Sequence, residues 1–152
     1  MELSGEKFVS ANIDLVWSSL NDIDVLKSSI PGCEKIERLS PEEVQATVMF
    51  KIGPVKARFS GTLLLSDVVP GKSCTMNFNG SGGAAGFAKG QSKVELHAVE
   101  GGTNVIYLSE ASIGGKLGQI GGRLISASAK KIADDFFEEF SKQLTASNCP
   151  IP

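Results

Sequence analysis

Residues 114–144 read GGKLGQIGGRLISASAKKIADDFFEEFSKQL, and this stretch predicts the long C-terminal helix that decides the fold. At about 100° per residue, the apolar side chains of its second half share one face, which carries Ala129, Ile132, Phe136 and Phe140. Farther back, the same face carries glycine in place of large side chains. A helix that fills a core at one end and lacks side chains at the other leaves space inside the protein, so the stretch predicts a cavity.

Four glycines form the sparse part of this face: Gly115, Gly118, Gly121 and Gly122. A glycine inside a helix costs roughly 0.5–1 kcal/mol relative to alanine, so their presence indicates a compensating need for room or for close approach. A bound apolar ligand is one such need. Tight packing of the helix against a sheet is the other, and the glycines alone do not separate the two.

The composition is that of an ordinary soluble globular protein, with 41% apolar and 21% charged residues among 152. We expect one domain over residues 1–146 and a short disordered tail over residues 147–152. The formal net charge of -2 gives no reason to expect a nucleic-acid partner, whose footprint would be strongly basic. Residues 1–16 contain no unbroken apolar run, so we expect neither a signal peptide nor a membrane span. Three widely spaced cysteines argue against a disulfide framework or a zinc site.

The rest of the chain predicts an antiparallel sheet. A first strand is expected over residues 2–10, followed by two short helices, one capped by Asn12 and one over residues 22–29. Alternation of apolar and polar residues between Gly and Pro turns then predicts about six strands, the clearest over residues 44–52, 55–65, 74–79, 87–99 and 103–111. The apolar face of such a sheet needs a cover. The sequence therefore predicts an α+β helix-grip fold, in which a curved antiparallel sheet of about seven strands surrounds the C-terminal helix.

Four motifs carry a resemblance to a known family. They are residues 30–33 (IPGC), 53–56 (GPVK), 86–90 (GFAKG), and the text from 114–117 (GGKL) through 129–137 (AKKIADDFF). Over nearly its whole length the chain resembles the CoxG proteins, which are accessory proteins of carbon monoxide dehydrogenase. They belong to the START-like, or SRPBCC, superfamily, which includes polyketide cyclases and Bet v 1 type proteins. The resemblance implies a START-like, Bet v 1-like helix-grip fold with an apolar cavity.

The resemblance also implies a partner and a role. It implies association with a molybdenum-dependent carbon monoxide dehydrogenase or a related hydroxylase, and either membrane recruitment of that enzyme or quinone handling for its electrons. Many family members continue into a linker and a C-terminal membrane segment, whereas this sequence stops at Pro152. That difference favours a soluble carrier over a stable anchor.

The larger side chains expected to line the cavity are Phe59, Leu63, Met76, Phe78, Phe87 and Tyr107, with Gly118, Gly121, Gly122 and Ile125 as the helix wall. Methionine and aromatic side chains suit a flat, polarizable ligand. The hydroxyl of Tyr107, the single tyrosine, could donate a hydrogen bond to a quinone oxygen. For any one of these aromatic residues, simple filling of the core is the commoner role.

Catalytic chemistry is poorly represented. His97 is the only histidine and is expected at the surface, so neither a histidine-paired nucleophile nor a multi-histidine metal site can be assembled. The carboxylates of residues 134–139 predict a solvated acidic face, with a docking site for a basic partner as the alternative. The glycine-rich residues 80–86 lie between two strands and open no helix, so a hairpin or pocket rim is favoured over a phosphate cradle.

A second face of the C-terminal segment carries Leu117, Ile120 and Leu124, rotated by roughly 100° or more from the phenylalanine face. If exposed, these side chains with Lys116 and Arg123 would form a small membrane-contact or enzyme-docking patch. Alternatively, the short helices cover them, or the helix begins nearer Gly122.

These observations predict a non-enzymatic carrier without metal or covalently bound cofactor. Its cavity would hold an isoprenoid quinone or similar lipid, taken from a membrane at the glycine-rich end and presented to a carbon monoxide dehydrogenase-type molybdenum hydroxylase. Its location would be cytoplasmic, with peripheral contact at the inner face of the membrane. A recruitment adaptor with no functional ligand and a small-molecule cyclase or hydratase are the alternatives, because fold-level kinship does not decide function. Leucine at Gly118 or Gly121 would block ligand uptake if these glycines line the cavity.

Overall fold

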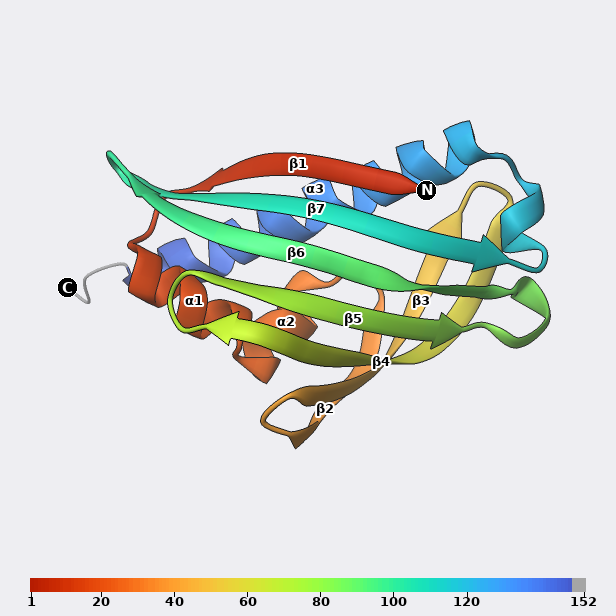
Figure 1. Cartoon of the computed structure of the whole chain (residues 1–152), viewed down its shortest axis with the longest axis horizontal. Helices are drawn as coiled ribbons and strands as arrows, with labels where there is room; N and C mark the ends of the chain where they lie inside the picture. The colour runs from red at the N-terminus through yellow and green to blue at the C-terminus, as the bar shows by residue number, and fades with distance from the viewer. Residues whose placement is uncertain (149–152) are drawn as a thin grey trace.

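A curved seven-stranded antiparallel sheet forms one layer of the protein, with strands in the order β1-β7-β6-β5-β4-β3-β2 (Figure 1). The computed structural model describes residues 1–148. The strands are β1 (Glu2–Val9), β2 (Cys33–Ser40), β3 (Glu43–Ile52), β4 (Val55–Val69), β5 (Ser73–Ser81), β6 (Phe87–Val99) and β7 (Gly102–Gly114). From β2 to β7 each strand pairs with the next along the chain, and β1 closes the far edge by pairing with β7.

Helices cover one face of this sheet. The two short helices after β1 are α1 (Ile13–Leu20) and α2 (Ile23–Ser29), and the long C-terminal helix is α3 (Gly122–Asn148). The Asn12 side chain caps α1 by accepting a hydrogen bond from the backbone N–H of Leu15 at 2.8 Å, as predicted. Asp22 caps α2 in the same way through Asp24, at 2.9 Å. The predicted helix-grip fold is confirmed.

The C-terminal helix begins later than its periodicity predicted. β7 continues to Gly114, a single 3-10 turn (η2, Leu117–Gln119) follows, and α3 starts only at Gly122. The φ angles of Gly115 and Gly121 are 72° and 97°, a left-handed conformation that glycine adopts readily and an α-helix excludes. The glycines from 114 to 121 therefore build the connection between β7 and α3 rather than one face of a helix.

Strand β2 is the element that no sequence pattern singled out. Its residues, CEKIERLS, do not alternate cleanly between apolar and polar types. Its pairing with β3 also shifts register twice, between Cys33 and Lys35 and between Arg38 and Ser40. Such bulges interrupt the period of two on which strand prediction depends. As the edge strand beyond β3, β2 also needs little apolar surface.

The core lies between the second half of α3, helix α1, and strands β1, β6 and β7. Phe140 is fully buried, with none of its surface exposed, and its ring packs against Phe136 and Phe137 at centroid distances of 5.6 and 6.3 Å. This half of the helix is filled with large side chains, as the sequence indicated. Residues 147 and 148 of the expected tail end α3, and its remaining residues, 149–152, lie outside the described part of the chain.

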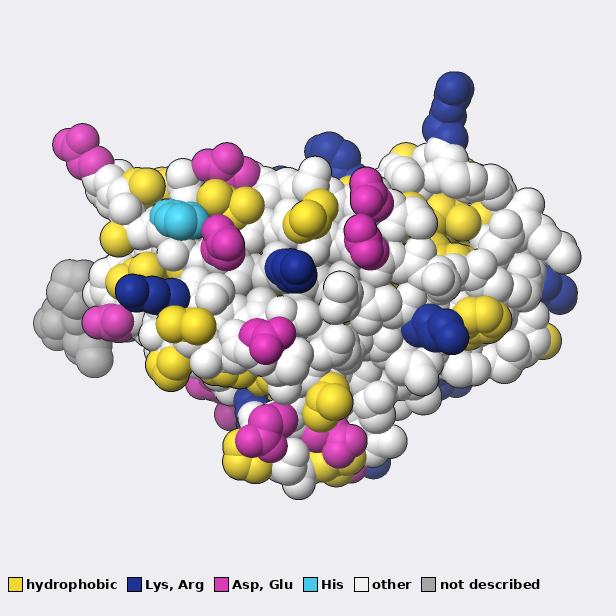
Figure 2. Space-filling model, viewed as in Figure 1, with side chains coloured by type: hydrophobic (Ala, Val, Ile, Leu, Met, Phe, Trp, Pro, Cys, Tyr) yellow, Lys and Arg dark blue, Asp and Glu magenta, His cyan; other side chains and the backbone are white. Residues whose placement is uncertain are grey.

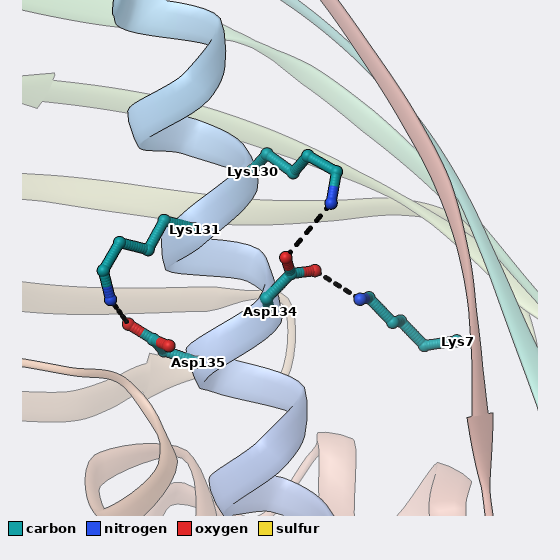
Figure 3. A network of polar contacts seen from close by, with 5 residues as sticks. All are labelled: Lys7, Lys130, Lys131, Asp134 and Asp135. Atoms are coloured by element: carbon teal, nitrogen blue, oxygen red, sulfur yellow. Dashed lines mark hydrogen bonds and ion pairs between the residues drawn. The ribbon is translucent and has the colours of Figure 1, made fainter.

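Ion pairs hold α3 to the sheet edge and neutralise the acidic face of this helix. Asp134 accepts hydrogen bonds from Lys7 on β1 and from Lys130 one helical turn away, and Lys131 pairs with Asp135 at 2.8 Å (Figure 3). These lysines occupy the carboxylates that could have formed a docking site for a basic partner. The solvated face that the sequence favoured is the better description.

The Lys7–Asp134 contact predicts a pH-dependent stability. Hydrogen bonds from Lys7 and Lys130 hold the pKa of Asp134 below its usual value of 3.8. A carboxylate whose pKa is lowered by folding stabilises the fold above its unfolded pKa, and this contribution is lost as the pH falls through the folded pKa. We therefore expect Asp134→Asn to lower Tm at neutral pH, and the difference from wild type to shrink as the pH falls below about 3.8.

Thermal melts of both proteins across this pH range check the expectation. Asp135→Asn is the matched control, because its pair with Lys131 lies within α3 and does not join the helix to the sheet. It should lower Tm less than Asp134→Asn. A Tm difference for Asp134→Asn that stays constant down to the lowest pH would contradict the assignment.

Candidate ligand-binding cavity

An inner cavity of about 330 Å³ lies between α3 and the sheet. Both short helices and most strands contribute to its wall, which is formed largely by apolar side chains. These include Trp17 and Leu20 from α1, Leu26 from α2, Leu65, Met76, Val94, Val105 and Tyr107 from the sheet, and Ala129, Ile132, Ala133, Phe136 and Phe137 from α3. The alanines let α3 approach this space without filling it, and the phenylalanines close it toward the core.

An outer cavity, also of about 330 Å³, lies toward the end of the sheet where β3 turns into β4. Its wall includes Val48, Phe50, Ile52, Phe59, Phe78 and Leu117. The rings of Phe50 and Phe59 lie 6.1 Å apart. Val44 and Leu63 belong to the walls of both cavities. The two cavities therefore adjoin, and together they form an apolar space that extends from beneath α3 to the β3–β4 turn.

The polar side chains of the inner wall are mostly engaged within the protein. The hydroxyls of Ser92 and Ser109 are hydrogen-bonded to each other at 2.8 Å. The Asn21 amide donates to the carbonyl of Trp17 at 2.9 Å, and the Arg38 guanidinium donates to the carbonyl of Asn21 at 2.7 Å. Satisfied groups of this kind cost little when an apolar ligand covers them. Polarity in this cavity therefore does not oppose binding of an apolar molecule.

Tyr107 brings an aromatic ring with a hydroxyl to the inner wall. The ring stacks on Phe137 with centroids 6.0 Å apart and planes 14° from parallel. It also covers Gly5 of β1, where a Cβ atom would lie only 2.4 Å from the tyrosine oxygen. Glycine at position 5 thus makes room for the phenol, and the stacked pair fixes its orientation.

The cavity walls lack the groups that acid–base or metal chemistry needs. Among the described residues that line either cavity there is no Asp, Glu or His. Burial raises the pKa of the Cys74 thiol, which keeps it in the neutral, weakly nucleophilic form. Within residues 1–148 no cluster of three potential metal ligands occurs. His97 is exposed on β6 and lies 3.2 Å from Glu95, at the surface as predicted.

The structure separates the predicted cavity residues into two groups. Five of them line a cavity: Phe59, Leu63 and Phe78 the outer one, and Leu63, Met76 and Tyr107 the inner one. Phe87 does not, because the alternation of β6 points its neighbour Ala88 inward and leaves Phe87 42% exposed. Ile125 is buried but belongs to neither wall.

The predicted glycine wall is wrong, because α3 begins only at its last member. Gly118, Gly121 and Gly122 are exposed and line neither cavity. A Cβ atom at Gly121 would meet nothing within 4 Å, so leucine there would extend away from both cavities and is not expected to block a ligand. The stretch of α3 that faces the space carries Ala129 and Ala133 instead.

Sequence reasoning assigned Phe136 and the residues that share its face to the core, although several of them line the inner cavity. The outer cavity could have been found from the sequence, because the alternation of residues 44–52 had placed Val44, Val48, Phe50 and Ile52 on one face. Trp17 carried no signal, since nothing in a short amphipathic helix shows whether its aromatic side chain meets a neighbour or an empty space.

The predicted contact patch at the start of α3 is only partly exposed. Leu117 is 2% exposed and lines the outer cavity, because the 3-10 turn folds it inward, so its predicted membrane or partner contact is wrong. Ile120 is half-buried, whereas Lys116, Arg123 and Leu124 are exposed. Leu124 touches the β3–β4 turn, where a Cβ atom on Gly53 would lie 2.6 Å from its Cδ2 atom.

Comparison with known proteins gives one family. The model of the CoxG family, whose description names it as a component of carbon monoxide dehydrogenase, matches residues 5–145. The chain belongs to the CoxG family. Comparison with curated proteins gives no match for this CoxG-family chain.

Solved structures similar to this CoxG-family protein share its architecture. A conserved protein from Geobacillus kaustophilus has a TM-score of 0.91 and 27% identity, with 97% of each chain covered. A START superfamily protein from Mycobacterium smegmatis has a TM-score of 0.74 and 11% identity, covering 97% of this chain and 99% of that chain. The Zhui aromatase/cyclase from Streptomyces sp. R1128 has a TM-score of 0.67 and 12% identity over 95% of this chain and 93% of that one. The last two likenesses show the fold alone, which is START-like.

Two motifs that carried the CoxG resemblance have structural roles around the cavities. In the IPGC motif, Ile30 and Pro31 line the inner cavity, and the carbonyl of Gly32 accepts a hydrogen bond from the Met49 amide at 2.9 Å. In the GFAKG motif, Ala88 lines the outer cavity. Both motifs therefore shape the apolar space of this CoxG-family protein. No helix in its described part is long and apolar enough to cross a membrane.

Proposed function

We propose that this CoxG-family protein is a non-enzymatic carrier of an isoprenoid quinone or a similar apolar lipid. The observation that carries the proposal is the pair of adjoining apolar cavities that meet at Val44 and Leu63. Small-molecule sites are mostly apolar clefts of about 300–1,000 Å³ with a few placed polar groups. Each cavity is within that range, and the elongated shape of the pair suits a molecule with a head and a tail.

The inner cavity offers the better site for a flat ring. Tyr107, Phe137 and Trp17 supply aromatic surfaces, and Met76 adds a polarizable thioether. Such groups favour a planar conjugated head, and the Tyr107 hydroxyl supplies a donor for a ring carbonyl. The outer cavity, which is lined by aliphatic side chains and three phenylalanines, then takes the apolar tail.

A carrier accounts for the chemistry of the walls better than an enzyme does. Acid–base catalysis needs a titratable group within hydrogen-bond reach of the substrate, and the described wall residues include no carboxylate or imidazole. The likeness to an aromatase/cyclase is 12% identical and therefore supports the fold rather than the reaction. Redox chemistry would belong to the partner, a carbon monoxide dehydrogenase-type molybdenum hydroxylase, which the family description suggests. The protein would work in the cytoplasm at the inner face of the membrane.

Native mass spectrometry of the protein purified from its own host, followed by solvent extraction, tests this proposal. We expect a stoichiometric quinone or lipid that is released only when the protein unfolds. Repeatedly empty preparations would overturn the carrier function and favour a recruitment adaptor, which binds the partner enzyme without needing the cavities. An empty protein that takes up no added quinone would settle the matter against the carrier.

A further inference from the structure

Positive charge gathers at one end of the protein. Three segments, residues 51–56, 82–89 and 112–124, contain five of the 15 Lys and Arg residues and none of the 17 Asp and Glu residues. We call the five the basic rim: Lys51, Lys56, Lys89, Lys116 and Arg123. The rest of the chain holds all 17 acidic residues and the other ten basic ones. A protein with a formal net charge of -2 thus has one strongly basic end.

The fold brings these three segments together at the end of the sheet where the outer cavity lies. The β3–β4 turn contacts the first turn of α3 through Gly53 and Leu124. The connection between β5 and β6 meets the end of β7, where a Cβ atom on Gly86 would lie 2.1 Å from the carbonyl oxygen of Gly114. In Figure 1 the three connections gather at the right-hand end of the molecule, far from α1 and α2.

The charges of the basic rim are free to meet a partner. All five side chains are exposed, and within residues 1–148 none of them takes part in an ion pair. By contrast, Lys7, Lys130 and Lys131 are paired with carboxylates. On the face shown in Figure 2, acidic side chains lie over the middle and left of the sheet, and the right-hand end shows Lys or Arg without them.

Apolar side chains stand among these charges. Phe87 and Leu124 are each 42% exposed, one at the start of β6 and the other in the first turn of α3. Leu117 and Ile52, from two of the same three segments, line the outer cavity directly behind them. Basic residues around exposed apolar side chains are the combination that places a protein at a bilayer interface, and an acidic protein surface would not call for the apolar part.

We propose that this end of the protein docks on the surface of a bilayer that contains anionic phospholipids. The basic rim contacts the headgroup phosphates, and Phe87 and Leu124 enter the interfacial layer. This inference rests on the proposed function in one respect: with the outer cavity facing the bilayer, an apolar ligand passes between lipid and protein without crossing water. The docking itself requires only the charges and the two apolar side chains.

Co-sedimentation with vesicles tests the docking. The full-length protein should sediment with vesicles of phosphatidylcholine mixed with phosphatidylglycerol, and much less with vesicles of phosphatidylcholine alone. Raising the salt concentration should release it, because salt screens exposed charges. Equal binding to both vesicle types, or binding that salt does not weaken, would overturn the proposal.

Matched variants locate the surface. Each basic side chain near an anionic membrane surface contributes about a factor of five to binding, so Lys116→Gln/Arg123→Gln should weaken vesicle binding by about 25-fold. Lys72→Gln/Lys93→Gln makes the same change in charge at exposed positions outside the three segments and should change binding far less. Likewise Leu124→Ser should weaken binding, and Leu64→Ser, at an exposed position of β4, should not. Circular dichroism verifies that each variant is folded.

The outcomes separate this inference from the carrier proposal. Equal losses for the rim and control variants would overturn the docking surface. Absence of vesicle binding, together with partner-enzyme binding that the rim variant loses, would make this end a protein interface and also overturn it. The bound lipid is measured in parallel by extraction: an empty protein that still binds anionic vesicles refutes the carrier and leaves the docking intact.

Discussion

Phe140→Ala is expected to lower the free energy of unfolding by about 3–5 kcal/mol, the usual cost of removing a buried phenylalanine ring. Phe140 has no exposed surface and stacks on Phe136 with centroids 5.6 Å apart. It also belongs to the core cluster with Val9 and Val16, so its loss leaves a cavity that neighbours on three elements would have to fill. Because these neighbours hold α3 against the sheet, the gap cannot collapse easily.

Urea denaturation of wild type and variant measures this effect, and thermal melts should show Tm lower by roughly 10 °C for a domain of this size. Phe8→Ala is the matched control, because Phe8 is 54% exposed on β1 and should cost about 1 kcal/mol or less. Similar losses for the two variants would contradict the assignment of the core to the second half of α3.

Strand prediction succeeded where one face of a strand is buried and the other is exposed. In β6, Ser92, Val94 and Leu96 are buried and the residues between them are exposed, so the alternation can be read directly from the sequence. β2 lacks this contrast because it lies at a sheet edge and its pairing contains two register shifts. Its existence follows from the pairing with β3, which no local pattern reports.

The cavity was predicted for a reason that the structure does not support. Helical periodicity counts only the spacing of residues, so it extended the helix through Gly115 and Gly121, whose positive φ angles exclude an α-helix. The sequence equally could not show that Phe136 faces a space rather than other side chains. Whether apolar surfaces meet or stay apart depends on the distance between α3 and the sheet, and that distance is a property of the whole fold.

The basic end could be seen only in part from the sequence. No acidic residue occurs between Glu43 and Asp67, between Asp67 and Glu95, or between Glu110 and Asp134. These gaps are visible without a structure, yet they become one surface only because an antiparallel sheet brings alternate turns to the same end. Lys116 and Arg123 were recognised beforehand as neighbours along the chain, whereas Lys51, Lys56 and Lys89 required the topology.

Leu63→Trp is expected to reduce the amount of bound ligand at least about tenfold, because overpacking a cavity wall costs about 1–3 kcal/mol and each 1.4 kcal/mol corresponds to a tenfold change in affinity. Leu63 lies in the walls of both cavities, so a larger side chain there narrows the space where they meet. A head bound in the inner cavity would then lose the path for its tail. Extraction and mass spectrometry of the purified variant measure the occupancy.

The neighbouring residue provides the control that makes the result specific. Leu64 is 48% exposed and lines neither cavity, so Leu64→Trp adds the same volume outside the apolar space and should leave occupancy unchanged. If Leu63→Trp is folded and binds as much ligand as wild type, the ligand does not pass Val44 and Leu63, and the two cavities do not act as one site. A ligand lost from Leu63→Trp but kept by Leu64→Trp would instead show that the site includes the junction, since the two variants differ only in the face of β4 that carries the added ring.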